Sequence, residues 1–155
     1  MQTRLIITLA ALVATTVGCG SNGLSSSQQD FNSYIEEANA LGGTEQTLLT
    51  GLDAVLGDNY VDDATVYVAY SQLLPEISSL IVTLQSIEAP GRLAPIHSKW
   101  VAGWQSLYTY AAQMVGAIET NDAGQLASIL SLQTQGIQLL TEYRSDLAQH
   151  RQQIK

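Results

Sequence analysis

The stretch Leu93–Ile118, LAPIHSKWVAGWQSLYTYAAQMVGAI, decides the fold because its apolar side chains recur at helical spacing. Steps of three and four residues place these side chains on one face of a helix. They are Leu93, His97, Trp100, Trp104, Leu107, Ala111, Met114 and Ile118. Pro95 falls in the first turn, where backbone N–H groups have no intrahelical partner. We predict one long amphipathic helix here.

Two further stretches, at the start and the end of residues 28–155, repeat this spacing. One runs from about residue 28 to Gly57-Asp58-Asn59, and Ser27–Asp30 at its start resembles a capping box with Asp in place of Glu or Gln. The other follows the turn Asn121-Asp122, which also caps it, and continues to Ile154. Both are expected to be helices.

A fourth helical pattern occupies the region before Pro90-Gly91. Asp62 or Asp63 can cap its first turn, since a short carboxylate accepts free backbone N–H groups. Pro75 lies inside it, and proline lacks an N–H and clashes with the preceding turn. We therefore expect a kink there, or a split after Leu74.

These four patterns predict an all-α fold in which residues 28–155 form a single antiparallel, up-down-up-down four-helix bundle. Connections of a few residues favour antiparallel neighbours. The sequence has no sustained alternation of apolar and polar residues, which is the pattern that would indicate strands. Folding the chain at its three turns brings several small residues to the level of one indole. The expected layer contains Gly42, Gly43, Ile77, Gly103, Trp104, Gly136 and Ile137.

The N-terminal segment precedes the only cysteine of the chain, Cys19. A basic start is followed by the uncharged run Leu5–Val17 and by Gly18-Cys19. This arrangement resembles the leader of a bacterial lipoprotein, although Thr16 stands where that family usually has Leu. The resemblance implies a signal peptide at 1–18 and a lipidated Cys19, and residues 19–27 are expected to form the lipidated cysteine and a flexible tether.

A second resemblance covers roughly residues 84–150. The proline turn in Ile87–His97, the early histidine in the helix after it, and a short turn at Glu119–Asp122 before a final helix look like a family of helical-bundle envelope lipoproteins. That family has no assigned activity. The resemblance therefore implies the bundle fold and an envelope location, and it implies no chemistry.

Composition limits the function classes. Fourteen acidic and six basic residues give a net charge of −8, and the chain has no Lys/Arg cluster that could bind a phosphate backbone, so we expect no nucleic-acid partner. The acidic residues are unevenly placed, because no Lys, Arg or His lies between Cys19 and Gly91. No motif of a hydrolase, a phosphate loop or a di-metal site is present. We expect neither an enzyme nor a cofactor.

Two groups of residues could nevertheless form sites. A pocket for an apolar ligand could lie in the middle of the bundle, unless Trp104 simply fills that space; its walls would be Gly42, Gly43, Trp100, Trp104 and Tyr108. A weak divalent-cation site or a face for a basic partner could lie at the end distant from Cys19, unless these carboxylates only cap helices. That group is Asp58, Asp62, Asp63, Glu119 and Asp122.

His97 and His150 are expected near the opposite end, with His97 a hydrogen-bonded core residue and His150 exposed. Without a third ligand they make no metal site. The sequence favours a monomeric, non-catalytic protein attached to the membrane by the lipid on Cys19, facing outside the cytoplasm, in the outer membrane if the host has one. Its expected partner is an unidentified envelope protein. The alternatives are the apolar-ligand bundle and the acidic cation site.

Overall fold

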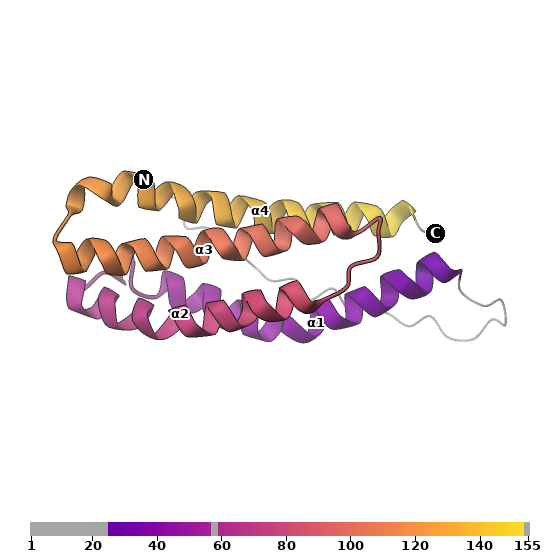
Figure 1. Ribbon diagram of the computed structural model, residues 1–155, viewed down its shortest axis with the longest axis horizontal. Helices are drawn as coiled ribbons and strands as arrows, with labels where there is room; N and C mark the ends of the chain where they lie inside the picture. Colours follow the sequence, from indigo (N-terminus) through magenta and orange to yellow (C-terminus); the bar gives the residue numbers. More distant parts are fainter. Residues whose placement is uncertain (1–24, 57–58, 154–155) are drawn as a thin grey trace.

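The computed structural model of the chain describes residues 25–56 and 59–153. In these ranges four long helices lie side by side and there is no strand. They are α1 (Ser26–Asp53), α2 (Asp63–Ser86), α3 (Ala94–Thr120) and α4 (Leu126–Gln153), with the short 3-10 helix η2 (Ala123–Gln125) before α4. Successive helices reverse direction through short connections (Figure 1). The predicted all-α four-helix bundle is confirmed.

The start of α1 differs from the prediction by two residues. The Ser25 side chain accepts a hydrogen bond from the backbone N–H of Gln28 at 3.3 Å, and Gln28 Oε1 accepts one from the Ser25 backbone N–H at 2.9 Å. This is a complete capping box. It forms at Ser25 rather than at Ser27 because Gln28 stands at the third helical position. The helix therefore begins inside the segment 19–27 that was predicted to be a tether.

The ends of α2 follow the expected chemistry, but its middle does not break. Asp62 caps α2 through the Thr65 backbone N–H at 2.7 Å. Pro75 lies on the exposed side of one continuous helix. Of the two alternatives predicted at Pro75, a kink or a split after Leu74, the split is wrong. The core contacts made before and after Pro75 outweigh the single hydrogen bond that proline removes.

The turn between α3 and α4 is longer than predicted. Asn121 ends α3 in the left-handed conformation, with φ 53°, which Asn tolerates better than most residues. Asp122 then caps η2, because its Oδ1 accepts from the Gly124 backbone N–H at 3.0 Å. The fourth helix therefore starts at Leu126, after η2, instead of directly after Asp122.

The most extensive contact between helices is that of α3 with α4, which lie side by side in Figure 1. Gly103 and Gly136 are both buried and face each other across this contact. A Cβ atom on Gly136 would lie 3.0 Å from the Gly103 carbonyl oxygen and 2.8 Å from Leu107 Cγ. Absence of side chains at both positions thus permits the close approach of the two backbones.

Part of the predicted glycine layer is present and part is not. Gly103, Gly136 and the fully buried Trp104 lie in the core, as does Ile77. Gly43 is exposed, and a Cβ atom there would meet nothing within 4 Å, so the predicted packing of Gly43 on Trp104 is wrong. Gly42 is half-buried. The side of α1 that faces Trp104 is instead the one that carries Glu45.

Among the helices of residues 25–56 and 59–153, none combines the length and the apolar character needed to cross a membrane.

The two kinds of glycine should respond oppositely to alanine. Gly136→Ala is expected to lower the free energy of unfolding by about 1–2 kcal/mol, because overpacking costs more than helix propensity returns. Gly43→Ala, the matched control in open space, should raise it by up to about 1 kcal/mol. Urea unfolding measures both. Stabilisation by both substitutions would show that α3 and α4 are not in close contact at Gly136.

Candidate functional site

A buried carboxylate occupies the interior of the bundle. Glu45 of α1 is 6% exposed, and its Oε1 accepts hydrogen bonds from the indole Nε1–H groups of both Trp100 and Trp104, each at 2.5 Å. The two tryptophans are four residues apart on α3, so their side chains lie on one face, one turn apart. One oxygen atom of α1 therefore satisfies both indole donors of α3.

The surroundings of Glu45 raise the pKa of its carboxyl group above the ordinary value. Burial raises the pKa of the carboxyl group, while the two indole hydrogen bonds and the positive charge of Arg144 lower it by less. The Nη2 atom of Arg144 is itself buried and has no hydrogen-bond partner in the described part of the chain. Arg144 thus contributes its charge to Glu45 without a direct bond.

A chain of hydrogen bonds continues from this cluster to the end of α2. His97 of α3 is 9% exposed; its Nε2 lies 3.0 Å from the Leu84 carbonyl oxygen and its Nδ1 lies 3.1 Å from the Tyr34 hydroxyl. A carbonyl oxygen can only accept, so Nε2 carries the proton and Nδ1 accepts from Tyr34. Burial lowers the pKa of His97, which favours the neutral ring that this arrangement requires.

Tyr34 and Tyr143 connect the histidine to the tryptophans. Tyr143 of α4 donates a hydrogen bond to Tyr34, and its ring stacks on Trp100 with centroids 4.7 Å apart and planes 7° apart. Burial, with smaller contributions from Glu45 and Glu37, raises the pKa of Tyr34 to about 12, although the bond from Tyr143 lowers it. All four helices therefore contribute to one interior network.

A second buried pair ties three helices together. Tyr70 of α2 donates to the Leu52 carbonyl oxygen of α1 at 2.9 Å, and its hydroxyl lies 2.9 Å from that of Tyr110 on α3. Because the Tyr70 proton is used on Leu52, Tyr110 is the donor of the second bond. Both hydroxyl groups are fully engaged inside the protein.

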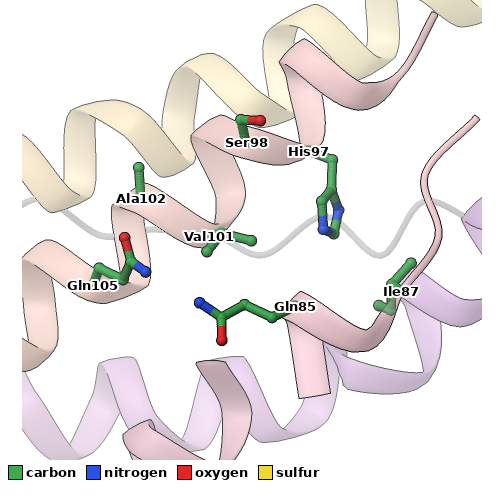
Figure 2. Close-up of a pocket in the computed structure, with 7 residues that line it drawn as sticks. All are labelled: Gln85, Ile87, His97, Ser98, Val101, Ala102 and Gln105. Atoms are coloured by element: carbon green, nitrogen blue, oxygen red, sulfur yellow. The ribbon is translucent and has the colours of Figure 1, made fainter. Parts of the chain in front are cut away.

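An open groove lies outside this interior, between the end of α2 and the first half of α3 (Figure 2). Its volume is about 300 Å³. The lining includes Gln85, Ile87, His97, Val101, Ala102 and Gln105. In Figure 2 the carboxamides of Gln85 and Gln105 extend toward the same space from opposite sides. No residue of the lining carries a formal charge when His97 is neutral.

The structure does not bring the five residues of the predicted apolar pocket together around a cavity. Trp100 and Trp104 are 1% and 0% exposed, and Glu45 occupies the position between their indole N–H groups. Tyr108 is 37% exposed, Gly43 faces open space and Gly42 is half-buried. None of the five lines the groove in Figure 2. The Trp layer is packed.

Four of the five acidic residues of the predicted distal cap have a partner within the chain. Asp62 caps α2 and Asp122 caps η2, Asp63 accepts from the Tyr60 hydroxyl at 2.8 Å, and Glu119 accepts from the Tyr67 hydroxyl at 3.0 Å. Asp58 lies outside the described residues. In the described ranges no three His, Cys, Asp or Glu side chains converge as metal ligands would.

The two histidines have different surroundings. His97 is the hydrogen-bonded core residue that its register predicts. His150 is half-buried rather than exposed, since its ring lies 5.9 Å from that of Phe31 on α1.

Sequence reasoning missed Glu45, which is central to the interior. Its signal is a gap in the apolar pattern of the first helix, between Leu41 and Leu48, where a carboxylate occupies the inward position. Two buried indoles also require an acceptor for their N–H groups. These two facts together identify a carboxylate directed at the tryptophans.

Comparisons with protein-family models, curated proteins and solved structures found no match for this chain.

The polar groups that a ligand could reach lie on the surface of the bundle. Glu45, Tyr34, Tyr70 and Trp104 bond to groups within the bundle, and their burial separates them from solvent. Such a network orients helices, because each member fixes the position of the next.

Substitutions at Glu45 should separate the need for an acceptor from the effect of charge. Glu45→Ala leaves two buried indole donors without a partner, so we expect the free energy of unfolding to fall by at least about 2 kcal/mol. Glu45→Gln keeps an oxygen acceptor and removes the charge, and should retain most of the stability at pH 7. Urea unfolding checks this order. Equal losses in both variants would contradict the shared-acceptor arrangement.

The charge of Glu45 should also appear in the pH dependence of stability. The pKa of Glu45 is raised above its ordinary 4.5 in the folded state, so the folded protein holds this proton more tightly than the unfolded chain. The contribution of Glu45 to stability is therefore greatest below pH 4.5 and falls as the pH rises through the folded pKa. The free energy of unfolding of Glu45→Gln relative to the unsubstituted protein should increase over this range. A flat difference between pH 4 and 8 would exclude the raised pKa.

Proposed function

We propose that this chain is a non-catalytic bacterial envelope protein, held to a membrane by a lipid on Cys19, that acts through its surface on another envelope component. The observation that carries the proposal is the sequence around Cys19. A basic start, the uncharged run Leu5–Val17 and Gly18 before the cysteine have the form of a lipoprotein leader. In this proposal the protein faces away from the cytoplasm.

The position of the bundle relative to Cys19 supports anchoring. The helix α1 begins at Ser26, seven positions after Cys19. Seven residues span at most about 25 Å even when fully extended. A lipid on Cys19 would therefore hold the start of α1 close to the membrane. Because successive helices are antiparallel, the α2–α3 turn and the groove beside it would lie at this same end (Figure 1).

The arrangement of polar groups supports a surface role. The buried groups that could perform acid–base chemistry, Glu45 and His97, are bonded to Trp100, Trp104, Tyr34 and the Leu84 carbonyl. A general acid or base has to reach the proton that it transfers to a substrate. Interaction through exposed residues fits this interior better than catalysis does.

Lipidation is tested by mass spectrometry of the protein extracted from the envelope of an expressing bacterium. We expect a mature chain that starts at Cys19 and carries a diacylglyceryl group, which with an N-acyl chain gives stable membrane attachment. Cys19→Ser should move the protein out of the membrane fraction. Ser21→Ala, the matched control in the same segment, should leave it there. A mature chain with an unmodified Cys19 thiol would overturn the proposal.

A further inference from the structure

The groove between α2 and α3 carries two side chains whose hydrogen-bonding groups have no partner among the described residues. Gln85 of α2 and Gln105 of α3 are exposed, and neither carboxamide forms a side-chain hydrogen bond within the described residues. Figure 2 shows both directed into the space between the helices. Each offers one acceptor oxygen and an NH₂ donor. Together they present donors and acceptors on both sides of one opening.

The remaining lining is apolar or neutral. Ile87, Val101 and Ala102 are partly buried and supply the alkyl part of the lining. The nearest basic residue in α3, Lys99, is directed to α4, where it bonds Glu142 at 3.0 Å and Asp146 at 2.9 Å. The lining residues themselves offer a charged ligand no opposite charge to replace its lost hydration. The groove therefore suits an uncharged ligand with both polar and alkyl parts.

The wall of the groove is held in place from inside the bundle. The His97 ring lines the groove, and both of its nitrogen atoms are engaged by Tyr34 and the Leu84 carbonyl. Leu84 is adjacent to Gln85, so the same hydrogen bond fixes the backbone that carries one carboxamide. A site built on helices with locked neighbours loses little freedom when a ligand binds.

We propose that this groove binds an amide group that carries a short alkyl substituent, such as an acetamido group. An amide has one carbonyl acceptor and one N–H donor, which the Gln85 and Gln105 carboxamides complement, and its alkyl part lies on Val101 and Ala102. The volume of about 300 Å³ matches a small ligand or one residue of a larger one. The amide can belong to a peptide or to an N-acetylated sugar.

This inference deepens the proposed function, because it states the chemistry of the envelope component that the surface would contact. It rests on the proposed function only for the cellular location in which the protein would encounter the ligand. Binding itself needs no lipid, so its test and the mass spectrum of Cys19 can fail separately.

The test is an NMR titration of the full-length chain in detergent, labelled at Ile and Val methyl groups. Two probes carry the amide, N-acetylglucosamine and N-acetylalanine methylamide, and glucose is the probe without it. We expect saturable shifts at Ile87 and Val101 with an amide probe, none with glucose, and none at Ile129 in the core of α4. The tighter of the two amide probes identifies the source of the group.

Substitutions then locate the binding. Gln85→Ala and Gln105→Ala should each weaken binding of the amide probe about 2–10-fold, which is the effect of one hydrogen bond. Gln72→Ala on α2 and Gln113→Ala on α3 are matched controls outside the groove and should leave binding unchanged. Because all four residues are exposed, the fold should survive each change, and thermal unfolding checks this. Equal shifts with glucose, no shift with either amide probe, or unchanged binding in both groove variants would overturn the proposal.

Discussion

The hydrogen bonds from Trp100 and Trp104 to Glu45 set the arrangement on which the rest of the interior depends. Two indole N–H groups in an apolar core require an acceptor, and a carboxylate in the same core requires donors. Here the Glu45 oxygen accepts from both indole N–H groups, so donors and acceptor satisfy one another. The carboxylate belongs to α1 and the indoles to α3, so this contact fixes how α1 lies against the remaining helices.

The bundle therefore joins its helices in two ways. Gly103 and Gly136 bring the backbones of α3 and α4 together without intervening side chains. Helix α1 adds long polar side chains to its apolar core contacts, since Glu45 contacts two tryptophans and Tyr34 contacts His97 and Tyr143. Hydrogen bonds of this kind are specific in position, whereas apolar contacts alone allow sliding. The polar interior thus helps to set the register of α1.

Much of the fold could be predicted from the sequence because helical spacing repeats along the whole chain. The core face of α3 and the hydrogen-bonded state of His97 follow directly from periodicity. Helix ends and interruptions were harder to predict. The capping box formed at Ser25 instead of Ser27, and α2 continued through Pro75, because these outcomes depend on side-chain reach and on packing elsewhere.

The candidate site could be predicted less well than the fold. The contact of α1 with Trp104 comes from Glu45 and not from the predicted Gly43, since side-chain direction around α1 is not given by the position along the bundle alone. Nothing in the sequence pattern marked Gln85 and Gln105 as residues of a site. Their meaning depends on two helices, far apart in sequence, being placed side by side, which only the tertiary structure provides.

The shared acceptor can be observed directly through the indole N–H resonances of Trp100 and Trp104 in a ¹H–¹⁵N NMR titration with pH. Both resonances should shift together, with one midpoint above the ordinary Glu value of 4.5, and both shifts should vanish in Glu45→Gln. Two different midpoints, a midpoint at or below 4.5, or a titration that persists in Glu45→Gln would contradict the central role assigned to Glu45.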